Sequence, residues 1–306
     1  MNYSEQKVMY FSRCEAALSR YLEATKGSAG ILGEAMHYAL MSAGKRVRPT
    51  LLYAAADAIP SRAEKAGVEE LDRLAAAVEM VHAYSLVHDD LPCMDNDLLR
   101  RGKPTTHVAF GEANALLAGD ALLNRAFELI LENIRLAQGE KSQPALIHAG
   151  SLMSKRFGQD GMIGGQVIDL ASEGQKISIE LLEELQLRKT SALIEAAVLG
   201  GAAAAGATPE ELHYLEVYAR DLGLAFQIRD DILDYSSDDE TMGKTVGKDL
   251  RDGKSTFVSL LGMEEAHARA EKATAAAEQA LDELENLGCR CAFLRALAID
   301  LLKREK

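Results

Sequence analysis

The stretch of residues 71–81, LDRLAAAVEMV, places its larger apolar side chains, Leu71, Leu74, Val78 and Val81, three or four positions apart. This spacing puts them on one face of an α-helix. The same period recurs along most of the chain, and no stretch shows the sustained alternation expected of a half-buried strand. The sequence therefore predicts an all-α protein.

The chain shows no division into separate domains. Its 306 residues are 48% hydrophobic, enough for one large helical core, and no Ser/Gly/Pro-rich linker interrupts them. The six prolines fall at breaks in the helical pattern, because proline lacks the N–H that a helix interior needs. The Ala-rich segment 197–205 fits close helix packing, either in the core or at a subunit interface. We expect one domain over residues 1–306.

Charge and composition exclude several classes of function. The net charge of −13 argues against a nucleic-acid partner, which would need a basic face. The first 18 residues predict an amphipathic helix rather than an export signal, and the small-apolar run 196–207 is too short to span a bilayer. The four cysteines lack zinc or disulfide-scaffold spacing and suit a reducing compartment. We expect a cytoplasmic protein without stable membrane insertion.

Two Asp-Asp pairs each end an apolar helical run, at 86–95 (LVHDDLPCMD) and at 227–234 (QIRDDILD). In the second run, Asp230 and Asp234 are four residues apart, about 40° around a helix axis, and share one face. Asp231 points aside. Two such helices facing each other across a bundle would bring both acidic clusters together.

The first cluster needs a bend to bring its carboxylates together. Asp89 and Asp95 are six residues apart and would lie on different faces of a continuous helix. Pro92 is expected to end the helix and let the chain carry Asp95 back towards Asp89. Both clusters could then offer carboxylates to a shared ion.

Carboxylates held close together repel each other, and a bound cation would offset this repulsion. Two of them at about 4 Å repel by about 4 kcal/mol at an effective dielectric near 20. Oxygen donors without His or Cys favour Mg²⁺, which usually binds one or two carboxylates together with substrate phosphates. Each Asp-Asp pair taken alone could equally decorate a solvated helix end. The apolar runs before both pairs favour the metal site, since burying carboxylates costs desolvation.

Basic residues cluster beside the acidic ones. Lys45, Arg46 and Arg48 lie between two predicted helices, at a helix N-terminus where an anion is favoured. Arg100 and Arg101 follow the first acidic cluster, and guanidinium groups can bind phosphate oxygens in pairs. This arrangement indicates two anions bound side by side, one through metal and one through basic side chains.

The polar segment 235–256 follows the second acidic cluster and resembles a mobile lid more than a core element. Its lysines, among them Lys244 and Lys254, could close over a diphosphate. From the residues alone they are equally well read as ordinary surface lysines, and the same holds for Lys189 and Thr190.

Taken together, these motifs resemble the trans-prenyl diphosphate synthases, in the group of bacterial farnesyl diphosphate synthases and related geranylgeranyl diphosphate synthases. The resemblance covers nearly the whole chain. It rests on the order and spacing of GKRVRP (44–49), HDDLPCMDNDLLRRGKPT (88–105), GGQ (164–166), KT (189–190), FQIRDDILD (226–234), GKT (243–245) and GKST (253–256).

The resemblance implies an all-α, largely antiparallel bundle around a deep central cavity, assembled as a homodimer. It implies three Mg²⁺ ions between the acidic clusters, with Mn²⁺ able to substitute. The implied metal-binding residues are Asp89, Asp90, Asp95, Asp230 and Asp234. The implied catalytic set adds Asp231, Arg100, Lys189 and Lys244.

The same resemblance implies two substrate sites. Contacts to an allylic diphosphate fall to Arg100, Lys189, Thr190, Gln227, Lys244 and Lys254. Contacts to isopentenyl diphosphate fall to Lys45, Arg48, His82 and Arg101. His82 precedes Asp89 by seven residues, two helical turns on nearly the same face, which agrees with a place in the cavity wall.

The implied reaction is head-to-tail (1′-4) condensation of isopentenyl diphosphate with dimethylallyl or geranyl diphosphate to farnesyl diphosphate. The steps are Mg²⁺-assisted ionisation, attack by the alkene and loss of a proton. A terpene cyclase or head-to-head synthase would need only one diphosphate site and leaves GKRVRP unexplained. A noncatalytic partner subunit would be expected to have lost aspartates, and both clusters are intact.

Product length depends on what blocks the cavity floor below the first acidic cluster. Tyr84 and Ser85 stand five and four residues before Asp89, and a ring at Tyr84 would stop growth early. The resemblance implies a fifteen-carbon product from an aromatic at this place together with the two extra residues inside DDLPCMD. Tyr84 could instead be a packed core aromatic. The resemblance includes a further feature, since a cysteine at the place of Cys93, where alanine is commoner, is found among geranylgeranyl diphosphate synthases. A geranylgeranyl diphosphate synthase with the same mechanism therefore stays the alternative.

Overall fold

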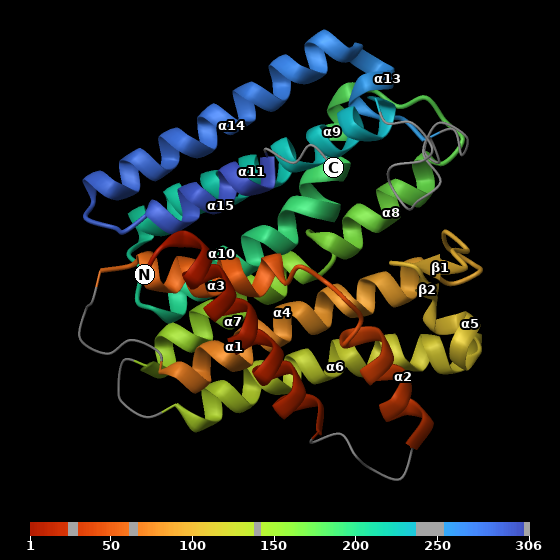
Figure 1. Ribbon diagram of the computed structural model, residues 1–306, viewed down its shortest axis with the longest axis horizontal. Coiled ribbons are helices and arrows are strands. Elements are labelled where there is room, and N and C mark those ends of the chain that lie inside the picture. Colours follow the sequence, from red (N-terminus) through yellow and green to blue (C-terminus); the bar gives the residue numbers. More distant parts are fainter. Residues whose placement is uncertain (24–29, 61–66, 138–141, 237–253, 303–306) are drawn as a thin grey trace.

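The computed structural model describes residues 1–23, 30–60, 67–137, 142–236 and 254–302, almost entirely as helices (Figure 1). The first half of the chain forms α1 (Tyr3–Glu23), α2 (Gly30–Leu40), α3 (Val47–Ala58), α4 (Val68–Asp89), β1 (Leu99–Arg100), β2 (Lys103–Pro104), α5 (Thr106–Phe110) and α6 (Glu112–Leu136). The second half forms α7 (Ser142–Phe157), α8 (Met162–Ser172), α9 (Ile179–Gln186), the π-helical turn η1 (Leu187–Ser191), α10 (Ala192–Ala204), α11 (Pro209–Ser236), α13 (Phe257–Leu261), α14 (Met263–Asn286) and α15 (Ala292–Leu302).

The all-α prediction is confirmed, with one small addition. Within the described residues the only strands are β1 and β2, which form a two-residue antiparallel hairpin. The hairpin turns at Arg101 and Gly102, whose φ angles are 54° and 76°. Such a turn needs positive φ, which glycine adopts freely, and two-residue strands are too short to show an alternating pattern in sequence.

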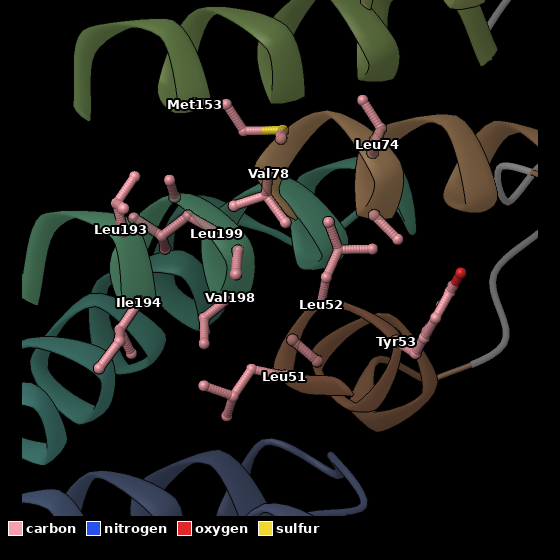
Figure 2. Close-up of a cluster of buried hydrophobic side chains, with 14 of the residues drawn as sticks. Leu51, Leu52, Tyr53, Leu74, Val78, Met153, Leu193, Ile194, Val198 and Leu199 are labelled. Carbon is pink, nitrogen blue, oxygen red and sulfur yellow. The ribbon is translucent and has the colours of Figure 1, made fainter. Parts of the chain in front are cut away.

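The Ala-rich helix α10 lies at the centre of the bundle. Nearly all its residues are buried, and it packs against α3, α4, α7 and α11. Figure 2 shows its side chains Leu193, Ile194, Val198 and Leu199 among those of the surrounding helices. The segment 197–205, which fitted either the core or a subunit interface, is therefore core.

Small residues let the backbones approach closely at this centre. A Cβ atom added at Gly201 would lie 2.1 Å from the carbonyl oxygen of Leu52 on α3. One added at Gly200 would lie 2.6 Å from the sulfur of Met153 on α7. Neither helix could come this near to a larger residue, so the composition of α10 follows from its central position.

The remaining helices surround α10 with short connections. Only residues 205–208 join α10 to α11, and the two helices pack together, so they run antiparallel. The long pairs α4 with α6 and α11 with α14 also lie side by side (Figure 1).

The two terminal helices belong to the same core. The Tyr3 ring on α1 contacts the Phe293 ring on α15, with centroids 5.2 Å apart. The Tyr218 hydroxyl on α11 donates to the Leu294 carbonyl, and the Arg290 N–H donates to the Ala58 carbonyl at the end of α3. Among the described helices, none has the length and apolar content that crossing a bilayer would require.

Candidate functional site

The first acidic cluster sits where α4 ends, at the side of the molecule shared with the β1–β2 hairpin and α8 (Figure 1). Helix α4 stops at Asp89, before Pro92, and the chain turns back sharply. The N–H of Asp95 donates to the carbonyl oxygen of Asp89 over 2.9 Å. The predicted break at Pro92 is confirmed, and it brings Asp95 beside Asp89.

The carboxylate of Asp89 is partly enclosed. The Gln166 side-chain amide on α8 donates to its Oδ1, and Lys189 Nζ lies 3.5 Å from its Oδ2. Burial raises the pKa of Asp89 above its usual value, while the Lys189 ammonium opposes that rise. An added cation would relieve the same desolvation cost, because it stabilises the charged form.

The carboxylate of Asp90 forms an ion pair with the guanidinium of Arg100. Asp90 is 3% exposed, and Arg100 Nε lies 2.8 and 2.9 Å from its two carboxylate oxygens. Burial raises the pKa of Asp90, and the Arg100 guanidinium counteracts this shift. The pair fixes the hairpin against the end of α4.

Two lysines lie between the first acidic cluster and Asp169 on α8. Lys189 Nζ, on η1, lies 2.6 Å from Asp169 Oδ2 on α8. Lys254 Nζ lies 3.4 Å from Asp95 Oδ1 and 4.0 Å from Asp169 Oδ2. Burial alone would lower the pKa of Lys189, but the Asp89 and Asp169 carboxylates raise it above its usual value.

The second acidic cluster lies on the last turns of α11, as predicted. Asp230 and Asp234 are half-buried there. Asp231 turns away from them, and its carboxylate accepts hydrogen bonds from the Phe257 N–H at 2.9 Å and from the Gln227 amide at 3.4 Å. Asp231 thus holds the start of α13 against α11, which indicates a structural contribution for a residue grouped with the catalytic set.

A polar cavity lies beside Lys189 and Lys254, the two lysines that contact the first acidic cluster, and Asp231 of the second cluster is part of its wall. It is lined by residues of α8, η1, α11 and the start of α13, among them Asp169, Lys189, Thr190, Gln227 and Lys254. Thr190 Oγ1 lies 3.3 Å from Gln227 Oε1, so η1 and α11 are linked at the cavity wall. The cavity places Lys189, Thr190, Gln227 and Lys254 together, as the resemblance implied.

The donors at this end of the molecule fit a magnesium ion. They are carboxylate oxygens of Asp89, Asp95, Asp230 and Asp234, and the buried Gln166 Oε1 has no hydrogen-bond partner within the described residues. In the described part of the chain, no three Asp, Glu, His or Cys side chains are already gathered into a metal site. Mg²⁺ would therefore need oxygens from a diphosphate and water as well, which is its usual mode of binding.

The basic motif at 44–49 separates into two roles. Arg46 is 5% exposed, and its backbone has the left-handed conformation, with φ 47°. Its guanidinium donates hydrogen bonds to Glu15 on α1 at 2.6 Å and to Glu79 on α4 at 2.9 Å. These ion pairs tie three helices together, and Arg46 also forms part of the wall of a neighbouring cavity. Arg48, in the first turn of α3, lines the same cavity, and no group of the described residues hydrogen-bonds to its buried Nε.

That second cavity contains the residues expected to bind isopentenyl diphosphate. Lys45, Arg48, His82 and Arg101 all line it, together with Glu79. Burial lowers the pKa of Arg48 and of Arg101, and burial and then the nearby arginines lower the pKa of His82 well below its usual value. Positive charge exceeds negative charge among these residues, so the cavity favours an anion.

The residues proposed to limit product length lie on α4 beside the carboxylates. Tyr84 is 7% exposed, and its ring meets that of His88 edge-on with centroids 5.3 Å apart. The Ser85 hydroxyl donates to the His82 carbonyl within the same helix. Lys244, GKT (243–245) and most of the predicted lid lie outside the described residues.

Two further residues contact the site, although no role was predicted for them from the sequence. Gln166, within the quoted GGQ motif, contacts Asp89, and Asp169 contacts Lys189. They are three positions apart on α8 and therefore share a face. That spacing was visible in the sequence, but only the packing of α8 against η1 shows that the face meets the acidic cluster.

Comparison with known proteins shows the family to which this fold belongs. The polyprenyl synthetase family profile matches residues 29–287. The chain is 41% identical over 307 residues to the farnesyl diphosphate synthase of Escherichia coli (strain K12), covering all of both chains. It is 44% identical over 278 residues to geranylgeranyl pyrophosphate synthase 7, chloroplastic, of Arabidopsis thaliana, covering 89% of this chain and 76% of the relative.

A solved structure agrees as well. The geranyltransferase of Helicobacter pylori, complexed with magnesium and isoprenyl diphosphate, has a TM-score of 0.79 at 33% identity, covering 97% of this chain and 96% of that one. The chain therefore belongs to the polyprenyl synthetase family.

Proposed function

We propose that this protein is a prenyltransferase of the farnesyl diphosphate synthase type. It joins isopentenyl diphosphate head to tail to dimethylallyl and then geranyl diphosphate. The C1–O bond of the allylic substrate breaks, a bond forms from its C1 to C4 of isopentenyl diphosphate, and a proton and diphosphate are released.

The proposal rests on one observation: helix α4 contributes residues to two neighbouring places where a diphosphate could bind, the acidic cluster through metal ions and the basic cavity directly. Asp89 ends α4 within the acidic cluster, and His82, seven residues earlier, lines the basic cavity. Seven residues span about 10 Å along a helix axis. Two diphosphates bound at these places would bring their hydrocarbon parts together, as a condensation between two substrates requires.

The protein's own groups bind and orient the two substrates. Arg48, Arg101 and Lys45 would hold isopentenyl diphosphate, whose charge compensates their mutual repulsion. Lys189 and Lys254, with the Thr190 hydroxyl, would donate hydrogen bonds to the allylic diphosphate and stabilise the charge that develops as it departs. Arg100 would contribute there once its link to Asp90 loosens.

The proposed cofactor is Mg²⁺, three ions with bound diphosphate, with Mn²⁺ as a substitute. Asp89, Asp95, Asp230 and Asp234 would hold it, and Asp90 would support the first cluster. When bound, Mg²⁺ supplies positive charge that stabilises the leaving diphosphate. The oxygen-only donor set and the magnesium in the H. pylori structure support this assignment.

Product analysis tests the function. Purified protein is incubated with isopentenyl diphosphate, Mg²⁺ and dimethylallyl, geranyl or farnesyl diphosphate, and the products are identified by mass spectrometry. We expect mainly the fifteen-carbon product from the first two. A twenty-carbon product would favour the geranylgeranyl alternative, which relatives such as the Arabidopsis protein keep open. No Mg²⁺-dependent condensation would indicate a noncatalytic partner subunit.

Variants of the two clusters provide a sharper version of the same test. Asp89→Ala and Asp230→Ala should keep the helical fold and lose about a hundredfold or more in turnover, because each removes a charge that supports the departing diphosphate. Asp160→Ala, at an exposed position between α7 and α8, is the matched control. Wild-type rates in either cluster variant would remove the metal assignment.

The product-length proposal rests on Tyr84, which is buried about one and a half helical turns before Asp89. Tyr84→Ala removes the ring that would meet the growing chain, so we expect the main product to lengthen from fifteen to twenty carbons. The measurement is the product ratio by mass spectrometry with geranyl diphosphate. An unchanged ratio would make Tyr84 a core aromatic that packs on His88 and nothing more.

We also propose that residues 1–306 form one polyprenyl synthetase domain, that the chain assembles as a homodimer and that it acts in the cytoplasm. The first proposal is supported by the packing of α1 and α15 in the common core. The second is supported by the exposed Leu116, Leu117 and Leu131 on α6. The four free thiols support the third, since they suit a reducing compartment.

A further inference from the structure

Asp169 on α8 has no role in the reaction proposed above, yet it stands between the two lysines of the site. Its Oδ2 lies 2.6 Å from Lys189 Nζ and 4.0 Å from Lys254 Nζ. Each lysine also faces a carboxylate of the first cluster, Lys189 at 3.5 Å from Asp89 and Lys254 at 3.4 Å from Asp95. Three carboxylates therefore share two ammonium groups.

The distances show which carboxylate holds Lys189. At 2.6 Å its ammonium donates a charge-assisted hydrogen bond to Asp169, whereas 3.5 Å to Asp89 is too long for a good hydrogen bond. The ammonium group is thus displaced towards α8 and away from Asp89. Asp89 in turn receives its hydrogen bond from the neutral Gln166 amide.

The placement of Asp169 depends on a close backbone approach. Gly165 lies one turn before Asp169 on the same face of α8, and an added Cβ there would come within 2.3 Å of the Lys189 backbone nitrogen. Helix α8 therefore rests directly on η1. This contact fixes the distance from the Asp169 carboxylate to the base of the Lys189 side chain.

A lysine that pairs with Asp89 competes with any cation that needs the same carboxylate. On the basis of the proposed function, we propose that Asp169 is a positioning residue. It holds the Lys189 ammonium away from Asp89, so that Asp89 remains available to a metal ion while the ammonium points into the cavity where the diphosphate binds. Without Asp169, Lys189 would close on Asp89, and a higher magnesium concentration would be needed to displace it.

The test measures metal dependence without turnover. An unreactive geranyl analogue, with sulfur in place of the oxygen between C1 and the diphosphate, is titrated into the protein by calorimetry over a series of Mg²⁺ concentrations. The readout is the Mg²⁺ concentration that gives half of the maximal affinity. It is measured for the wild type, Asp169→Asn, Lys189→Gln and the double variant, after circular dichroism shows that each is folded.

We expect Asp169→Asn to raise the Mg²⁺ midpoint about tenfold, a size common for groups coupled within one hydrogen-bonded network. In the Lys189→Gln background the same substitution should change the midpoint by less than about twofold, because no ammonium remains to compete. Asp169→Glu, which restores a carboxylate, should recover part of the loss. Asp160→Asn, at an exposed carboxylate between α7 and α8, should behave as the wild type.

Three results would overturn the proposal. An equal rise in the midpoint with and without Lys189 would make Asp169 a direct partner of the metal. An unchanged midpoint in Asp169→Asn would leave the residue without this role. If the wild type itself bound the analogue without any dependence on Mg²⁺, the proposed function would fall, and this inference with it.

Discussion

Two arginines of one short motif perform different tasks. Arg46 joins Glu15 and Glu79 inside the bundle, while Arg48 faces the basic cavity with its Nε unpaired within the described residues. A side chain that pairs with buried carboxylates supports the fold, whereas a buried N–H group without a partner gains one when an anion binds. Although they are only two positions apart, Arg46 thus contributes to stability and Arg48 to the binding of an anion.

We expect Arg46→Ala to lower the free energy of unfolding by about 3–5 kcal/mol, because Glu79 is left buried without a counter-ion. Arg48→Ala should leave stability nearly unchanged and raise the KM for isopentenyl diphosphate by about tenfold or more, the value of one charge-assisted hydrogen bond. Urea unfolding and steady-state kinetics on both variants check this. If Arg48→Ala lowered the free energy of unfolding and Arg46→Ala raised the KM instead, the two assignments would be reversed.

His82 predicts a pH dependence of stability. Its pKa in the folded protein lies well below the ordinary 6.5, chiefly through burial and then through Arg48 and Arg101. Below pH 6.5 the unfolded chain takes up a proton that the folded protein refuses, so the free energy of unfolding falls as the pH falls towards the lowered pKa. Above pH 6.5 both states are neutral and the effect vanishes.

The check is a comparison of the wild type with His82→Gln. The slope due to His82 is at most about 1.4 kcal/mol per pH unit, the value for one proton. Urea unfolding between about pH 5.5 and 7 should show a shallower dependence in the variant. Parallel curves would mean that His82 titrates normally in the folded protein.

At the scale of the residue, the sequence predicts the acidic clusters and their bend well, because proline chemistry and helical spacing are local. From the residues alone it does not separate Arg46 from Arg48, since that depends on where Glu15 and Glu79 lie in space; only the family resemblance assigned Arg48, and not Arg46, to the substrate site. It also leaves Asp169 without a role, because the contact with Lys189 requires two helices that are distant in the chain.

At the scale of the element, α10 is predicted as a helix by its composition but not as the central one. An Ala-rich run fits a core or an interface equally well until its neighbours are known. What decides its place is backbone contact, such as that of Gly201 with the Leu52 carbonyl. The β1–β2 hairpin escaped prediction for a different reason, since two residues per strand form no pattern.

Gly201→Ala should destabilise the protein by about 1–3 kcal/mol, because the added methyl group meets a backbone carbonyl that cannot rotate away. Gly30→Ala, at the exposed start of α2 where nothing lies within 4 Å, is the matched control and should be neutral or slightly stabilising. Both are measured by urea unfolding. Equal stability of the two variants would contradict the close packing of α10.

At the scale of the whole molecule, the outward face of α6 tests the proposed homodimer. Leu117 and Leu131 are 52% and 65% exposed and lie about 40° apart around the helix. Replacing both by Glu would place charges in an apolar interface, so we expect a monomer by light scattering after size exclusion. Val68→Glu, equally exposed on α4, should stay dimeric. A dimer that survives the double replacement would exclude this face.

The central position of α10 has a consequence for synthesis on the ribosome. Leu52 and the rest of α3 leave the ribosome early, but the helix that covers them ends at Ala204, some 150 residues later. At about 5–20 residues per second, the apolar face of α3 waits roughly 8–30 s for its partner. The nascent chain therefore exposes part of its future core for about half of translation, and chaperones can bind that part during this interval.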